Sequence, residues 1–313
     1  MNQRVLITGG TGLVGKRLTE MLLTSGYDVI ILSRNSRQSD NPRITYAQWD
    51  IKSQTLDEPA ITQAEYIINL AGAGVMDKTW SAAYKQEIIE SRSKSSELLI
   101  KGLQIYKNNV KAVVSASAIG WYGKDAKDSK HVKSFVENDP ASDDFLGNTC
   151  RIWEESIEPV AARGIRLTRF RIGIVLSNEG GAFPEFTKPV KLGIAAILGN
   201  GKQVISWIHI DDLCRLFIYA LTNDSIRGTY NAVAPNPVTN KTLVLKVANL
   251  LRKTFFIPIH VPSILLKLML GQRSIEILKS TTVDSSKIQK EGFTFNFPSI
   301  DEALKNLFPF NKK

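Results

Sequence analysis

The chain has 313 residues, of which 43% are hydrophobic and 22% charged, and this balance is typical of a globular protein whose core needs no crosslinks. Its two cysteines, Cys150 and Cys214, form no Cys-x-x-Cys pair, which argues against a disulfide scaffold or a zinc module. Its three histidines, His131, His209 and His260, lie far apart in the sequence, so we predict no metal site.

The net charge of +10 is compatible with binding to nucleic acid, binding to an anionic membrane, or a solvated basic surface. Acidic and basic side chains are mixed between Lys124 and Lys133, so we expect neither a nucleic-acid nor a membrane partner. The apolar stretch Phe255–Leu266 is too short to span a bilayer. A strand at the very start leaves no room for a signal peptide, and we predict a cytoplasmic protein whose oligomeric state the sequence leaves open.

The first half of the chain alternates short apolar runs with longer helical patterns, which predicts βαβ units on a parallel sheet. The apolar runs lack clean alternation, as expected for strands buried on both faces. The predicted strands are Val5–Thr8, Val29–Ser33, Ile44–Gln48, Tyr66–Leu70, Val110–Ser115, Arg166–Arg171 and, later in the chain, Gly228–Ala232.

Three helices are predicted between these strands. In the third, Ser142 is the expected N-cap, Gly164 follows the end, and Pro159 should kink the helix. The predicted helices are Gly12–Ser25, Trp80–Leu103 and Asp143–Arg163.

A glycine-rich loop follows the first strand and opens the first helix, which is the context that a dinucleotide-binding loop requires. Gly9 and Gly10 would allow the tight turn, Gly12 the approach of a pyrophosphate, and Gly15 the packing of helix on strand. The helix N-terminus would then offer N–H groups to the phosphates. A glycine turn without a ligand is the alternative. The loop residues that we predict to contact the cofactor are Gly9, Gly10, Thr11, Gly12, Leu13, Val14 and Gly15.

The end of the second strand distinguishes NAD from NADP. An NAD site places Asp or Glu there to bind the ribose 2′-hydroxyl, but this strand ends in Ser33 and Arg34, and Asp28 lies at the wrong end. An arginine suits a 2′-phosphate, which predicts NADP(H); a plain surface cation is the alternative.

After Leu176 the alternation stops, and from Thr239 onward the chain is mostly helical. We predict an α/β fold: a Rossmann-type doubly wound parallel sheet with a smaller, mostly helical C-terminal lobe. Residues 1–235 would form the NADP-binding domain, with 176–225 contributing to the substrate lobe, and residues 236–313 would form the C-terminal lobe. The ligand cleft would lie between the two.

Several short motifs resemble the extended short-chain dehydrogenase/reductase superfamily. They are Asn69–Gly72, Ser115–Ala118, Tyr122-Gly123 and Trp207–Leu213. A narrower set, spread over the whole chain, is similar to the NAD(P)-binding epimerase family, whose members carry names such as nucleoside-diphosphate-sugar epimerase or cell-division-inhibitor-like protein and end in a small domain of unknown function. This set comprises Trp80, Ser91-Arg92, Trp153-Glu154, Gly173–Leu176, Trp207–His209 and Gly292–Phe295.

The resemblance implies further cofactor contacts. Ser33 and Arg34 would meet the 2′-phosphate, and Val175 would touch the nicotinamide end. The other residues implied are Leu70, Ala71 and Gly72 along the adenosine and ribose path, and Glu87 and Arg92 on the long helix. A solvated pair is the alternative for Glu87 and Arg92.

The chain departs from the superfamily at its catalytic motif, Tyr-x-x-x-Lys. None of the eight tyrosines has a lysine four residues on, and Leu146 and Cys150 stand where the pair should be. In that pair the lysine lowers the pKa of the tyrosine, so that the phenol exchanges a proton with the substrate. Ser117 and Tyr122 are the remaining catalytic candidates. A packed tyrosine is the alternative for Tyr122, and Cys150 is either a reactive thiol or inert packing.

The sequence therefore supports two functions. The first is an NADP-dependent oxidoreductase or epimerase-like enzyme with an atypical site that acts on an unknown small molecule. The second is a non-catalytic NADPH-sensing regulatory protein, which the absent Tyr and Lys favour.

Overall fold

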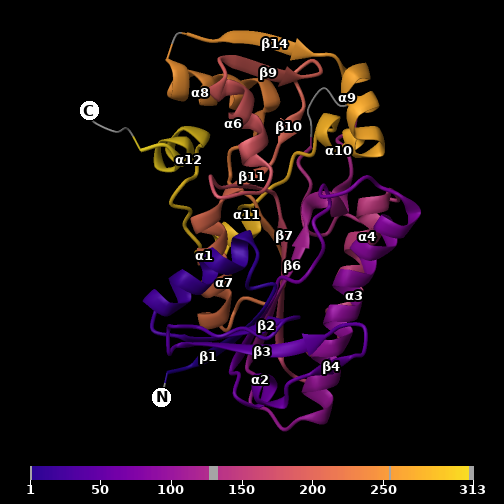
Figure 1. Ribbon diagram of the computed structural model, residues 1–313, viewed down its shortest axis with the longest axis vertical. Helices are drawn as coiled ribbons and strands as arrows, with labels where there is room; N and C mark the ends of the chain where they lie inside the picture. Colours follow the sequence, from indigo (N-terminus) through magenta and orange to yellow (C-terminus); the bar gives the residue numbers. More distant parts are fainter. Residues whose placement is uncertain (1, 127–132, 254, 310–313) are drawn as a thin grey trace.

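The computed structural model describes residues 2–126, 133–253 and 255–309. Its centre is an eight-stranded sheet in the order β12-β7-β6-β5-β1-β2-β3-β4, parallel throughout except for the short antiparallel pair β3–β4 (Figure 1). All seven predicted strands are present, with ends that differ by a few residues. The strands are β1 (Arg4–Thr8), β2 (Asp28–Ser33), β3 (Ile44–Asp50), β4 (Thr55–Leu56), β5 (Tyr66–Asn69), β6 (Ala112–Ala118), β7 (Arg166–Ile172) and β12 (Gly228–Ala232).

The chain order of these strands creates a switch point. From β1 the chain runs outward through β2, β3 and β4, and then returns to the other side of β1 with β5, β6, β7 and β12. The loops after β1 and β5 therefore diverge at the carboxyl edge of the sheet, which is where ligands bind in open α/β folds.

Helices cover both faces of the sheet, as the buried strands require. On one face, α1 and α7 pack together over a core that includes Leu18, Phe170 and Phe217; on the other, α3 and α4 cover a core that includes Ile67, Leu99 and Val113. The helices are α1 (Leu13–Thr24), α7 (Ile210–Thr222) and α11 (Ser286–Lys290) on the first face, and α2 (Glu58–Thr62), α3 (Ala82–Ile105), α4 (Phe145–Ile157) and α5 (Pro159–Ala162) on the second.

A smaller lobe lies beyond the carboxyl edge and has its own core around Phe183, Trp207 and Leu243 (Figure 1). It is rich in helix, as predicted, but it also contains short strand pairs that the sequence did not predict: β8–β11, β9–β14 and β10–β13. Its elements are β8 (Ile174–Leu176), α6 (Phe183–Lys191), β9 (Ile194–Leu198), β10 (Val204–Ile205), β11 (Trp207–His209), β13 (Val238–Thr239), α8 (Asn240–Arg252), β14 (Ile257–Val261), α9 (Ser263–Leu270), α10 (Ser274–Leu278) and α12 (Ile300–Leu307).

The last segment of the chain is attached to α7. The carboxylate of Asp212, fully buried on that helix, accepts the backbone N–H groups of Asn296 and Phe297 at 2.9 and 2.8 Å. The ring of His209 packs on Phe297 with 4.0 Å between centroids. Thus α7, although predicted to contribute to the lobe, packs on the sheet and fastens the C-terminal segment to it. The predicted division at residue 235 stays a prediction.

The predicted helix Asp143–Arg163 is two helices. Pro159 starts the second, α5, and Gly164 follows its end with a φ of +77°. The predicted N-cap Ser142 is wrong: the cap is Asp144, whose side chain accepts the N–H of Gly147 at 2.8 Å. The N–H of Ser142 instead donates to the carbonyl of Trp121, which holds Ser142 in the preceding loop.

No helix in the described parts of the chain is long and apolar enough to cross a membrane.

Candidate cofactor and active site

Three of the four loop glycines are required by the packing of the protein itself. A Cβ on Gly9, whose φ is +69°, would lie 2.9 Å from the backbone of Leu70, and one on Gly10 would lie 2.8 Å from the side chain of Ile31. A Cβ on Gly15 would lie 2.4 Å from the carbonyl oxygen of Gly9, so its absence lets α1 pack against the loop.

Gly12 differs from the other three. Its backbone is extended, with φ −79° and ψ 177°, which any residue can adopt. An added Cβ would meet only the carbonyl oxygen of Gly9, at 3.3 Å. Gly12 is also the N-cap of α1 and makes no side-chain cap, so the first-turn N–H groups of the helix face outward. The opening that Gly12 leaves therefore lies at a helix N-terminus suited to an anion.

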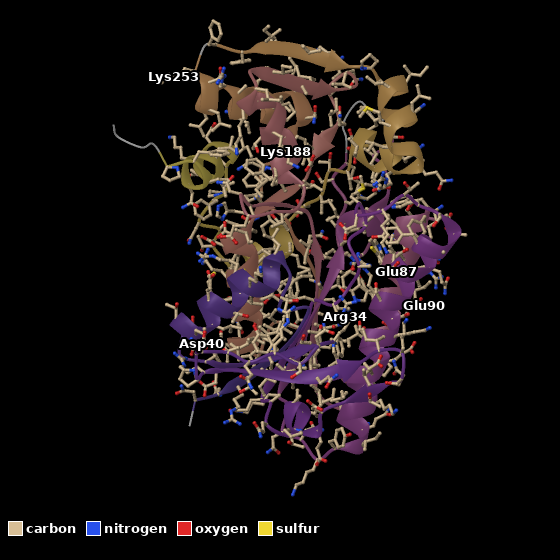
Figure 2. All side chains as sticks on the ribbon, viewed as in Figure 1. Arg34, Asp40, Glu87, Glu90, Lys188 and Lys253 are labelled. Atoms are coloured by element: carbon tan, nitrogen blue, oxygen red, sulfur yellow. The ribbon has the colours of Figure 1, made fainter. Side chains whose placement is uncertain are left out.

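The end of β2 presents an isolated cation. Ser33 is buried, whereas Arg34 is exposed and makes no ion pair with any residue that the structure describes (Figure 2). Asp28, at the start of β2, instead pairs with Arg43 at 3.0 Å. No acidic side chain therefore occupies the position that would bind a ribose 2′-hydroxyl.

A buried polar network fixes the loop after β5 against β1. The Thr8 hydroxyl donates to Asn69 at 2.7 Å and accepts the N–H groups of Leu70 and Ala71, both at 3.0 Å. The Asn69 amide in turn donates to Ser96 and Ser115. The two loops predicted to line the dinucleotide path are therefore joined by direct hydrogen bonds.

Arg92 on α3 packs beneath this loop. Its guanidinium donates to the carbonyls of Ile88 and Ala73, at 2.8 and 3.0 Å, and lies 4.9 Å from the ring centre of Trp153. Burial lowers the pKa of Arg92. Gly72 makes room for this side chain, because a Cβ there would lie 3.0 Å from the Arg92 guanidinium carbon.

Glu87 and Val175, which the resemblance also implies as cofactor contacts, lie apart from Arg92. Glu87, five residues before Arg92 on α3, is half-exposed and pairs with Lys78 at 3.1 Å (Figure 2). Val175 lies on β8, beside Ile208 of β11, and packs against the core of the first sheet face.

The positions of the missing Tyr and Lys are closed by packing. Leu146 and Cys150 lie against Gly120, where a Cβ would come within 3.2 and 3.6 Å of their side chains. Burial raises the pKa of the Cys150 thiol to about 12. A neutral, buried thiol of this kind behaves as packing, which argues against the reactive alternative.

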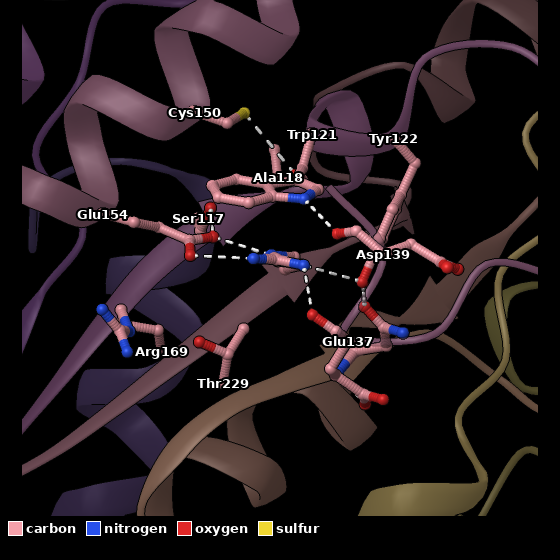
Figure 3. A network of polar contacts seen from close by, with 12 residues as sticks. Ser117, Ala118, Trp121, Tyr122, Glu137, Asp139, Cys150, Glu154, Arg169 and Thr229 are labelled. Atoms are coloured by element: carbon pink, nitrogen blue, oxygen red, sulfur yellow. Dashed lines mark hydrogen bonds and ion pairs between the residues drawn. The ribbon is translucent and has the colours of Figure 1, made fainter. Parts of the chain in front are cut away.

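Ser117 and Tyr122 are brought together in one buried network (Figure 3). Ser117 donates to Glu154 at 2.7 Å, and Glu154 forms a two-point ion pair with Arg171 at 2.8 and 3.0 Å. The same arginine donates to the Tyr122 hydroxyl at 3.0 Å, and that hydroxyl donates to Asn231 at 2.6 Å. Every member of this network is at least nine-tenths buried.

The network restricts what Tyr122 can do. Its ring stacks on Phe135, and burial raises its pKa to about 12, although the neighbouring Arg171 opposes this shift. At neutral pH the hydroxyl is therefore protonated and already committed to two partners. A catalytic role for Tyr122 would therefore require its proton to leave Asn231, and its raised pKa makes it a weaker acid than a free phenol.

Sequence reasoning missed three members of the network. Glu154 was noted only as part of a family motif. Arg171 and Asn231 were predicted only as strand residues, the first at the end of Arg166–Arg171 and the second within Gly228–Ala232. A charged side chain at the end of a buried strand was the one signal, because such a group needs a buried partner.

A cavity of about 480 Å³ lies between the lobe and the loop that follows β6. Lys124 approaches it from the loop, and Lys267 and Lys279 from the lobe; Lys279 also pairs with Glu276 at 2.7 Å. The charged residues in its lining are therefore all lysines, beside four uncharged polar residues.

The described residues contain no group of three His, Cys, Asp or Glu placed to hold a metal ion. His209 caps α7 by accepting the N–H of Asp211, and His260 is exposed on β14. His131 lies outside the described residues.

The chain matches two family models: the NAD dependent epimerase/dehydratase family over residues 5–232, and a domain of unknown function over residues 261–307. It is 34% identical over 309 residues to the epimerase family protein YfhF of Bacillus subtilis, with 98% of this chain and 99% of that one covered. Among solved structures it is similar to the human epimerase family protein SDR39U1 with NADPH (TM-score 0.84, 27% identity, covering 97% and 99% of the two chains). It is also similar to a nucleoside-diphosphate sugar epimerase from Corynebacterium glutamicum (TM-score 0.77, 28% identity), of which it covers 58% while 97% of this chain is matched.

Proposed function

The chain belongs to the NAD dependent epimerase/dehydratase family, and from this premise we propose that it is an NADP(H)-binding enzyme that acts on a small molecule by oxidoreductase or epimerase-like chemistry. The observation that carries the proposal is the pairing of two features at the switch point. One is the opening at Gly12, which the packing of the protein does not require, and the other is Arg34 at the end of β2, which makes no ion pair with any residue that the structure describes.

In this proposal the loop from Gly9 to Gly15 binds the pyrophosphate, and Ser33 and Arg34 bind the 2′-phosphate. Leu70, Ala71 and Gly72 line the adenosine and ribose path, and Glu87, Arg92 and Val175 border the rest of the dinucleotide. The cofactor would supply or accept a hydride when bound. The human relative with NADPH supports the choice of NADP(H).

The choice of cofactor can be tested by calorimetry of the wild-type protein with NADPH and NADH. We expect NADPH to bind more tightly, because a 2′-phosphate gains charge-assisted hydrogen bonds from Arg34 that a hydroxyl does not. Equal affinities would contradict the assignment.

We propose that the substrate is an anionic small molecule bound in the cavity lined by Lys124, Lys267 and Lys279. A thermal-shift screen of anionic metabolites in the presence of NADPH tests this, because a ligand that binds the folded state raises the melting temperature. Lys267→Ala should abolish the shift that any hit produces, since that lysine extends from α9 into the cavity and makes no ion pair among the described residues.

The network around Glu154 favours a second candidate, a non-catalytic NADPH sensor. Ser117 and Tyr122, our proposed catalytic groups, are both engaged by buried partners, and Leu146 and Cys150 close the usual position of the proton relay. The loss of NADPH absorbance with each thermal-shift hit separates the two candidates: turnover that Ser117→Ala and Tyr122→Phe abolish supports the enzyme, whereas ligand binding without turnover supports the sensor.

A further inference from the structure

An unusual amount of apolar surface is exposed at the outer end of the lobe. Seven side chains between residues 255 and 269, on β14, on α9 and just before β14, are 44–82% exposed. Figure 1 places both elements along the outer rim of the molecule, far from the sheet. We call these seven side chains the rim surface: Phe255, Ile257, Ile259, Ile264, Leu265, Leu268 and Met269.

The arrangement on α9 indicates that these side chains do not belong to the cavity. Ser263 and Lys267, one helical turn apart, line the cavity. The pairs Ile264/Leu268 and Leu265/Met269, also one turn apart, occupy the remaining outer surface of the helix and are exposed. Exposed apolar patches of this kind mark protein or membrane contacts.

The charge around the rim surface is of one sign. Residues 186–210 and 225–275, which build most of the lobe, contain no Asp or Glu. Lys188 and Lys246 are paired with Glu185 and Asp301, which lie outside these stretches. The cations of the lobe that make no ion pair with any described residue are Lys191, Lys202, Lys241, Arg252, Lys253, Lys267, Arg273 and Lys305 (Lys188 and Lys253 are labelled in Figure 2).

A second copy of the chain fits this surface poorly. A symmetric pair would bring the same cations face to face. Pairing of a further strand with the free edge of β14 is also hindered. The backbone groups of Ile257 and Val261 are directed to the β9 side, and Pro258, whose backbone faces the free edge, has no N–H to donate. Aliphatic side chains without an aromatic cluster also suit nucleic acid poorly.

We propose that the rim surface docks the protein on an anionic lipid bilayer. The aliphatic side chains of β14 and α9 would enter the interfacial region, and Arg252 and Lys253 would contact lipid phosphates and carboxylates. This reverses the expectation of no membrane partner. That expectation rested on the mixed charges between Lys124 and Lys133, whereas the fold gathers on one lobe exposed apolar groups and cations that pair with no described residue.

Sedimentation with vesicles tests the proposal, using phosphatidylcholine alone or mixed with phosphatidylserine. We expect the wild-type protein to bind the mixed vesicles more tightly and to be released by high salt. Lys253→Glu should weaken binding about fivefold or more, because each basic residue near an anionic surface contributes about 1 kcal/mol. Leu268→Glu should weaken it at least about tenfold, because it removes a buried aliphatic group from the interface.

Matched controls lie at the opposite end of the molecule. Ile105, 61% exposed at the end of α3, and the exposed Lys107 give Ile105→Glu and Lys107→Glu, which should leave vesicle binding unchanged. Circular dichroism verifies that each variant is folded. Equal binding to both kinds of vesicle, or equal effects of Leu268→Glu and Ile105→Glu, would overturn the proposal. So would a wild-type dimer that Leu268→Glu dissociates, since the occupant would then be a second copy.

Discussion

Gly12 and Gly15 lie three residues apart, yet we expect alanine to weaken NADPH binding at the first position and to lower stability at the second. At Gly15 the new Cβ would lie 2.4 and 2.5 Å from the backbone of Gly9 and Gly10. Overpacking costs about 1–3 kcal/mol, and the better helix propensity of alanine returns about 1 kcal/mol. Gly15→Ala should therefore reduce the free energy of unfolding by up to about 2 kcal/mol and lower the melting temperature by a few degrees.

At Gly12 the backbone already suits alanine, and the one close contact, 3.3 Å to Gly9, is mild. The stability change should stay under about 1 kcal/mol. The methyl group, however, would stand in front of the first-turn N–H groups of α1. Loss of two charge-assisted hydrogen bonds, at about 1.5–3 kcal/mol each, would weaken NADPH binding at least about 100-fold.

Calorimetric titration with NADPH, together with thermal unfolding of both variants, measures these quantities. We expect a folded Gly12→Ala protein whose NADPH binding is at least about 100-fold weaker, and a less stable Gly15→Ala protein. If Gly12→Ala bound NADPH as tightly as the wild type, the opening would not be the phosphate site.

Three further outcomes are expected. Arg34→Asp should reduce the preference for NADPH over NADH at least about tenfold, whereas Arg37→Asp, an exposed control nearby, should leave it unchanged in the same titrations. Ser117→Ala and Tyr122→Phe each leave a buried partner without a hydrogen bond, so chemical denaturation should detect a loss of about 1–3 kcal/mol, with NADPH affinity retained. Burial lowers the pKa of His209, so as the pH falls the unfolded chain binds a proton at a higher pH than the folded protein does. Stability should therefore fall as the pH drops below about 6.5. His209→Asn, which keeps a capping oxygen, should flatten that part of the pH profile of the melting temperature.

The sheet could be predicted from sequence because its strands are short apolar runs separated by turns, and Gly228–Ala232 matches β12 residue for residue. The strands of the lobe could not. Ile194–Leu198 and Ile257–Val261 pair only with each other, and the second contains a proline and lies exposed, so it lacks the pattern of a buried strand. Their pairing depends on the tertiary arrangement of the lobe.

The same contrast holds for the candidate site. The glycine loop and Arg34 could be singled out because the prediction depends on local context, namely a strand end and a helix start, and their roles in binding stay predictions. The network was not, because Glu154 and Arg171 meet only when α4 packs on β7, and Tyr122 reaches Asn231 across 109 residues of sequence. No local pattern encodes such a contact.

The attachment of the C-terminal segment to α7 has a consequence for how the protein can be divided. The Asp212 carboxylate is fully buried, pairs with Arg215 at 2.7 Å and accepts the N–H groups of Asn296 and Phe297, so removal of the last segment would take away two of the three partners that the structure describes for it. The part that contains the sheet and the C-terminal part are therefore not interchangeable modules: a fragment that ends near residue 235 would lack two of the donors that Asp212 of α7 uses. Heat should melt the whole chain in one cooperative step, and recombination between relatives should succeed only when α7 and the segment that it binds are inherited together.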